Sequence, residues 1–165
     1  MTPTDTLILP TLAIGIAATL LMDGWAMLRR RLLGMPSLDY AMVGRWVGHM
    51  PRGRFRHAAI GKAAAVTGER ALGWLVHYLT GIVFALAFVM LAGESWLNRP
   101  TLAPALLFGL VTVAMPFLLM QPAFGLGIAA AKTAAPARAR LHSLLTHAVF
   151  GLGLYLGAQA LVALT

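Results

Sequence analysis

The chain has 165 residues, of which 59% are hydrophobic and only 11% are charged. A soluble domain has about 45 to 50% apolar and about 25% charged residues, so this composition excludes an ordinary water-soluble fold. The net charge of +8 does not indicate a nucleic-acid partner, because no soluble module is present to carry the basic residues. The absence of cysteine excludes disulfides, thiolate metal sites and cysteine nucleophiles.

Four apolar runs are long enough to cross a bilayer, which takes about 20 helical residues. They cover residues 7–28, 71–93, 101–121 and 144–165. Each must be helical, because a lipid-exposed backbone has to satisfy its own hydrogen bonds. We therefore predict an all-α integral membrane protein forming a single membrane domain over residues 1–165. Pro116 lies deep in the third run and is expected to kink that helix, because it frees the carbonyl of Thr112.

The connectors between these runs differ in charge. Residues 29–70 hold nine of the thirteen Lys and Arg, whereas the connector around residues 93–100 holds only Arg99. The remaining three lie just before the fourth run, at Lys132, Arg138 and Arg140. The positive-inside rule places the basic connectors in the cytoplasm and both termini outside.

The long basic connector contains a pattern of its own. Apolar residues recur at helical spacing over residues 37–50, which predicts an amphipathic helix lying in the membrane interface. Basic side chains here are predicted to bind anionic lipid headgroups, at about 1 kcal/mol each. The predicted headgroup-binding residues are Arg45, Arg52, Arg54 and Arg56. Residues 123–140 are rich in Gly and Ala, and an extended helix, a re-entrant segment and a loop all remain open.

The second and fourth runs begin with matching residues at identical spacing. Arg70, Gly73, Leu75, His77 and Gly81 correspond to Arg140, Ser143, Leu145, His147 and Gly151. Together with a weaker match between the first and third runs, this indicates two parallel helix-pair repeats related by an axis along the membrane normal.

Polar residues within the spans share one predicted depth. Asp23 lies six residues before the Arg29–Arg31 triplet, about 9 Å along a helix. His77 and His147 lie seven residues after Arg70 and Arg140, about 10 Å by the same arithmetic. Gln121 completes a predicted ring with one residue from each helix. Because a charge in the membrane is costly without a partner, these four residues form the predicted ligand or ion site.

Several chemistries fit such a site. Asp23, His77 and His147 can relay protons, coordinate a divalent metal, or complete a structural hydrogen-bond network. His49, His57 and His142 are expected to be solvated or to face headgroups, and we assign them no chemistry. No nucleotide-binding loop, nucleophile elbow or zinc-protease motif is present, so we predict no catalytic residues.

Several segments together resemble a family of bacterial inner-membrane proteins. They are residues 22–25, 44–57, 73–78, 120–122 and 144–151. The family is catalogued as domain of unknown function 2938, and the resemblance covers nearly the whole chain. It implies a location in the bacterial inner membrane and carries over no site residues.

Three functions compete on this evidence. The first is binding or transport of a small solute or ion through the Asp/His site, for which four short helices are expected to require a homodimer. The second is a redox protein in which His77 and His147 bind haem iron or, with Asp23, a metal. The third is a non-catalytic scaffold or lipid-binding protein.

Overall fold

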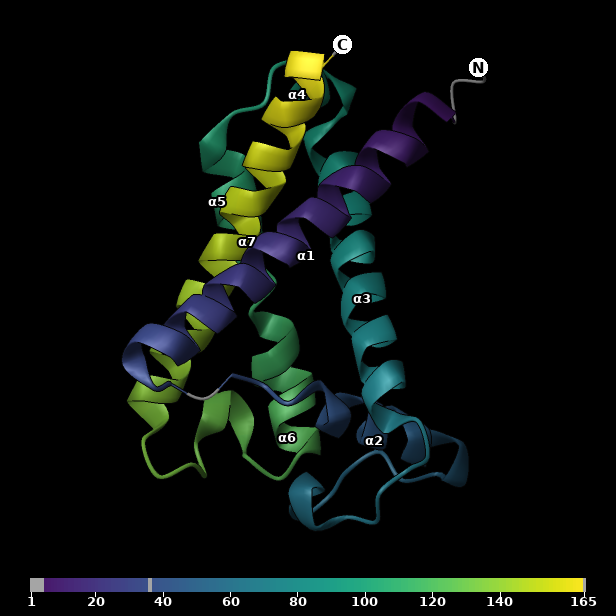
Figure 1. Ribbon diagram of the computed structural model, residues 1–165, viewed down its shortest axis with the longest axis vertical. Helices are drawn as coiled ribbons and strands as arrows, with labels where there is room; N and C mark the ends of the chain where they lie inside the picture. The colour runs from purple at the N-terminus through teal and green to yellow at the C-terminus, as the bar shows by residue number, and fades with distance from the viewer. Residues whose placement is uncertain (1–4, 36, 165) are drawn as a thin grey trace. The chain divides into compact units, whose positions relative to one another are not determined.

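The computed structural model describes residues 5–35 and 37–164, and within these residues the chain is all-helical (Figure 1). Four helices are long and apolar enough to cross a membrane. They span Leu7–Leu33, Glu69–Ala92, Leu102–Ala123 and Pro136–Leu164. The predicted all-α class, with four helices apolar enough to cross a membrane, is therefore confirmed. Thr165, the predicted end of the fourth run, lies outside the described residues.

Two of the long helices extend further into the basic connectors than predicted. Helix α1 (Asp5–Leu33) continues through the arginine triplet, because Arg is a good helix former, and ends before Gly34, which has a φ of +63°. Helix α7 (Pro136–Leu164) begins eight residues earlier than predicted, since proline is well suited to the first helical turn. Helix α3 (Glu69–Ala92) is close to its prediction.

The third apolar run is interrupted. Helix α5 (Leu102–Val111) stops one residue before Thr112, and a π-helical segment covers Met115–Met120 before the short helix α6 (Gln121–Ala123). The Gln121 N–H donates to the Pro116 carbonyl, five residues back. The disturbance predicted around Pro116 thus takes the form of a break in regular α-helical bonding.

The chain folds into two compact units, which are described separately. Unit one contains the stretch up to Ser37, Tyr78–Thr112 and the stretch from Leu145 onward. Unit two contains Leu38–His77 and Val113–Leu144. Helices α3 and α7 therefore contribute their first turns to unit two and the remainder to unit one.

Small residues bring the helices of unit one together. A Cβ added to Gly15 of α1 would lie 2.8 Å from the Ile82 Cα of α3. One added to Gly109 of α5 would lie 2.5 Å from the Gly151 Cα of α7. Such approach is how membrane helices associate, because lipid removes the hydrophobic drive between them. Helix α4 (Glu94–Asn98) adds the buried Trp96, whose indole N–H donates to the Thr101 carbonyl at 3.2 Å.

Unit two is built on the contact between α2 (Tyr40–His49) and the first turns of α3. Asp39 caps α2 by accepting the Ala41 N–H at 3.0 Å. A Cβ on Gly44 would clash with the Glu69 carbonyl, and a Cβ on Gly73 would clash with the Tyr40 carbonyl. Helix α2 falls within the predicted range 37–50, and its location in the membrane interface stays a prediction.

The stretch after α6 packs against the basic connector within unit two. The His57 N–H donates to the Ala123 carbonyl at 2.8 Å, and the Ile60 N–H donates to the Phe124 carbonyl at 3.1 Å. Gly125, with a φ of +86°, leaves no room for a Cβ beside the Ala58 carbonyl. Residues 124–135 therefore do not extend the helix but form turns, with one short 3₁₀ segment at Ile128–Ala130.

Candidate functional site

Asp23 is held by a tyrosine of unit one. It lies on α1, and the Tyr78 hydroxyl of α3 donates to its Oδ2 atom at 3.1 Å. Both side chains are partly buried. A carboxylate within an apolar span requires such a donor, because its desolvation is otherwise uncompensated.

His147 is held by a threonine in the same unit, and the geometry fixes its tautomer. Thr112 Oγ1 lies 2.5 Å from the Gly109 carbonyl and 2.8 Å from His147 Nδ1. The hydroxyl has one hydrogen, and the carbonyl can only accept, so that hydrogen is directed at Gly109. His147 must therefore donate its Nδ1–H to Thr112. In the neutral imidazole, Nε2 then carries the lone pair that can accept a proton.

Thr112 holds this position at the point where the third run breaks. It is the residue that ends α5, and its backbone N–H donates to the Phe108 carbonyl at 3.0 Å. The π-helical segment follows three residues later. Such segments often occur at functional sites, because they leave the backbone irregular where a side chain must be placed.

The other two predicted site residues belong to unit two. His77 stacks on Tyr40, with ring centroids 4.1 Å apart, and its Nε2 atom lies 3.0 Å from the Tyr40 hydroxyl. Gln121 is 7% exposed, and its Oε1 atom has no hydrogen-bond partner among the described residues. Each of the three predicted ionisable residues thus has a hydroxyl partner within its own unit.

The structure offers no multi-ligand metal centre within the described residues. No group of three or more His, Asp or Glu side chains there could hold a metal ion. The hypothesis of a metal bound by Asp23 with the two histidines therefore gains no support from the geometry.

Arg45, predicted to bind headgroups, is engaged inside unit two. Its Nη2 and Nε atoms contact the two carboxylate oxygens of Glu69 at 2.7 and 2.8 Å. Its Nη1 atom donates to the carbonyls of Ile60 and Ala63 at 3.3 and 3.2 Å. The hydrogen bond to Glu69 raises the pKa of the Arg45 guanidinium above its ordinary value. Arg52, Arg54 and Arg56 are exposed.

His49 is buried, and the prediction that it is solvated is wrong. It is 3% exposed, and its Nε2–H donates to the Ala64 carbonyl at 3.0 Å. Its Nδ1 atom lies 3.0 Å from His57 Nε2, which must then supply the hydrogen. Burial, together with the neighbouring His49 and Arg54, lowers the pKa of His57. The spacing of apolar residues could not predict this pair, because the contact between His49 and His57 depends on how the connector folds.

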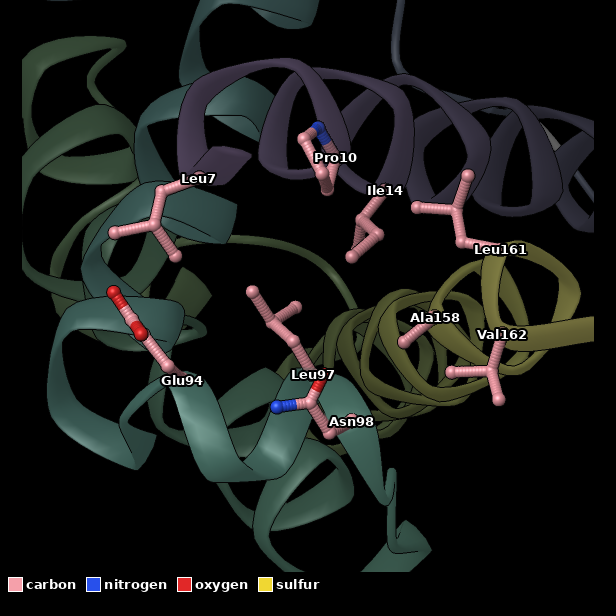
Figure 2. Close-up of a pocket in the computed structure, with 9 residues that line it drawn as sticks. All are labelled: Leu7, Pro10, Ile14, Glu94, Leu97, Asn98, Ala158, Leu161 and Val162. Carbon is pink, nitrogen blue, oxygen red and sulfur yellow. The ribbon is translucent and has the colours of Figure 1, made fainter. Parts of the chain in front are cut away.

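Unit one also contains a mainly apolar pocket of about 240 Å³ (Figure 2). It lies between the first turns of α1, helix α4 and the end of α7, with the polar ends of Glu94 and Asn98 on the α4 side. Its lining residues are Leu7, Pro10, Ile14, Glu94, Leu97, Asn98, Ala158, Leu161 and Val162. None of the predicted site residues lines it.

The sequence reasoning missed the hydroxyl partners Tyr40, Tyr78 and Thr112. The available signal was chemical, since Tyr and Thr are among the neutral side chains able to donate to a carboxylate or to pair with an imidazole within an apolar span. Spacing alone could not pair them, because the partners are separated by 35 to 55 residues in the chain.

Comparison with known proteins supports the resemblance found in the sequence. The model of a family described as a protein of unknown function, DUF2938, matches residues 12–161. No curated protein and no solved structure matches the chain.

Proposed function

We propose that this chain, which belongs to the DUF2938 family, binds and moves a small ion or solute across the membrane, with Asp23 and His147 carrying protons. The observation that supports this most is the fixed tautomer of His147. Thr112 receives the Nδ1–H and so directs the proton-accepting lone pair to Nε2. An imidazole held in one tautomer within an apolar helix is suited to proton transfer, because the nitrogen that accepts the proton is fixed.

Asp23 supplies the complementary group. Its carboxylate is held by Tyr78 at 3.1 Å through one oxygen, on a helix of the same unit. A purely structural role would need no ionisable groups here, since a charged carboxylate near the centre of a membrane costs on the order of 2.5 to 3.5 kcal/mol. An amide could make the same hydrogen bond at lower cost.

The break in the third run also supports transport. π-Helical segments inside membrane helices are frequent at functional sites, where the backbone departs from regular α-helical bonding. Here the break begins at Thr112, the partner of His147.

The proposal includes the predicted topology in a bacterial inner membrane, with both termini outside and the basic connectors in the cytoplasm. It also includes the parallel duplication, which the glycine contacts of unit one favour. The matched residues Gly81 and Gly151 each contact a glycine of the preceding membrane helix, Gly15 and Gly109. Each of these glycines accepts a hydrogen bond from a threonine one turn later, at 2.8 and 2.5 Å.

A lipid-binding role is the second candidate, and the exposed arginines of unit two favour it. Arg52, Arg54 and Arg56 surround Gly53, whose φ of +72° makes a turn. Three exposed cations on one turn provide about 1 kcal/mol each toward an anionic leaflet. Replacing all three with Gln should weaken the protein's preference for anionic over zwitterionic lipid, and an unchanged preference would exclude this role.

Proton flux through the purified protein tests the main proposal. The protein is reconstituted in liposomes loaded with a pH-sensitive dye, and flux is driven by a potassium diffusion potential. We expect wild-type liposomes to acidify or alkalinise faster than empty ones, and Asp23→Asn and His147→Gln each to reduce the flux about tenfold or more.

Two matched substitutions control for general damage. Asp39→Asn leaves the cap of α2 intact, because Asn caps helices as well as Asp. His142→Gln makes the other histidine change, five residues before His147 in α7. Both should retain wild-type flux. Wild-type liposomes no more permeable to protons than empty ones would refute proton transfer through the protein.

A further inference from the structure

Arg29, at the arginine-rich end of α1, is buried without an acceptor. It is 7% exposed, and its Nε and Nη1 atoms have no hydrogen-bond partner among the described residues. The indole N–H of Trp25, one turn earlier on the same helix, is buried and lacks a partner in the same way. Three donor groups therefore lie close together on one helix without an oxygen to receive them.

This arrangement is costly as it stands. A guanidinium stays protonated under all ordinary conditions, so it cannot escape burial by losing its charge. The guanidinium carbon of Arg29 lies 5.9 Å from the centre of the Trp25 ring, but that contact gives its Nε and Nη1 donors no acceptor. Burying unpaired donors and a charge is strongly unfavourable.

Arg45 is an arginine of the same chain whose guanidinium nitrogens all have acceptors within the protein. That side chain has a carboxylate on two nitrogens and backbone carbonyls on the third. Arg29 has neither. No side chain or carbonyl among the described residues accepts from the Nε and Nη1 atoms of Arg29, which leaves them available to an acceptor from outside the chain.

We propose that Arg29 and Trp25 form a binding site for a phosphate oxyanion, either the phosphate of a lipid headgroup or free inorganic phosphate. Phosphate oxygens accept several hydrogen bonds from one guanidinium, and the charge of the anion compensates that of Arg29. The exposed Arg30 and Arg31 add positive potential beside the site. The carboxyl end of a helix does not itself attract anions, so the affinity comes from the side chains.

This site is separate from the proposed proton pathway, since it binds an anion through a permanently charged group. The test measures the thermal stability of the purified protein after delipidation in a neutral detergent. The probes are phosphatidylglycerol, phosphatidylcholine and inorganic phosphate, added in increasing amounts to wild type, Arg29→Met and the matched control Arg30→Met.

We expect an anionic probe to raise the melting temperature of wild type and of Arg30→Met in a saturable way. Arg29→Met should require at least roughly tenfold more of the same probe, because it loses charge-assisted hydrogen bonds. Without any probe, Arg29→Met should be at least as stable as wild type, because it no longer buries an unpaired charge. A variant that binds the probe more weakly but is no less stable without it has lost a ligand site, whereas ordinary structural damage would lower its stability as well.

The probes distinguish the source of the oxyanion. A response to phosphatidylglycerol but not to phosphate supports a lipid headgroup, and a response to phosphate alone supports the free ion. If neither acts on wild type, or if Arg29→Met responds as wild type does, the proposal is overturned. If Arg29→Met does not fold, Trp25→Phe provides the second test, because losing the indole N–H should weaken probe binding several-fold, and unchanged binding would overturn the proposed site.

Discussion

The substitution Thr112→Val tests the proposed control of His147 directly. Valine has nearly the shape of threonine but lacks the hydroxyl that receives the His147 Nδ1–H at 2.8 Å. The Gly109 carbonyl loses the Thr112 hydroxyl as a donor at the same time. The change therefore removes the hydrogen bond that selects the tautomer while leaving the packing of α5 on α7 almost unaltered.

The expected size of the effect follows from the loss of that bond. Hydrogen bonds between membrane helices average about 0.6 kcal/mol and reach about 1.7, whereas leaving a buried donor unpaired costs about 1 to 3 kcal/mol. We expect about 1 kcal/mol of lost stability, because Thr112 is buried and His147 is only partly so. The same energy would allow other tautomers and orientations of His147, and so reduce proton flux about two- to fivefold.

Equilibrium unfolding in mixed micelles measures the stability, and the liposome assay measures the flux. Thr112→Ser keeps the hydroxyl and should behave as wild type in both. Nitrogen NMR of labelled histidine reports the tautomer. If the His147 proton is on Nε2 in the wild-type protein, or if Thr112→Ser is as impaired as Thr112→Val, Thr112 does not select the tautomer of His147.

Three further predictions concern unit two. Gly73→Ala should lower stability by about 1 to 3 kcal/mol, despite the better helix propensity of Ala, because the added Cβ clashes with a backbone carbonyl of α2; equilibrium unfolding measures this. Arg45→Met should cost roughly 1 to 3 kcal/mol by leaving Glu69 partly buried without its cation, and a double-mutant cycle with Glu69→Gln measures the coupling. Acid should loosen the basic connector around His57. The pKa of His57 is lowered in the folded connector, so the opened segment binds more protons than the closed one. The closed connector therefore loses stability as the pH falls below about 6.5, the ordinary pKa of histidine. Hydrogen exchange of residues 49–64 at pH 7.5 and 5.5 measures this opening.

Each of these predictions has a control. Gly24→Ala on α1 meets no atom within 4 Å, so it should be neutral or slightly stabilising, and an equal loss in both glycine variants would contradict the steric argument. Arg52→Met removes an exposed arginine and should leave stability unchanged. His57→Gln keeps a donor toward His49 without titrating, and its opening, taken from exchange rates divided by the intrinsic rate at each pH, should not depend on pH in this range. If it does, the acid response has another origin.

The long apolar runs could be predicted well because the bilayer imposes one simple condition. A run such as residues 71–93 must be helical and about 20 residues long, and the helix observed, Glu69–Ala92, differs from this by two residues at its start and one at its end. The start of α7 was missed because the helix extends beyond the apolar run. Its first turns carry Arg138 and Arg140, which hydropathy counts as connector but which form a helix readily.

The pairing of polar groups could not be predicted in this way. Depth placed Asp23 and His147 at a similar level, yet it carries no information about which neighbouring side chain each would meet. Asp23 meets Tyr78 and His147 meets Thr112 because glycine contacts set how closely particular helices approach. The burial of His49 depends likewise on how residues 50–64 fold back over α2.

Four helices long and apolar enough to cross a membrane follow from the amino-acid sequence alone, since hydrophobic length is a local property of each segment. The bonding of Arg45 to Glu69, and the burial of Arg29 without an acceptor for its Nε and Nη1 atoms among the described residues, depend on the folded chain. These two arginines look alike in the sequence, because each is a basic residue among apolar residues at helical spacing. They differ because a hydrogen bond depends on distance and direction between atoms that only folding brings together.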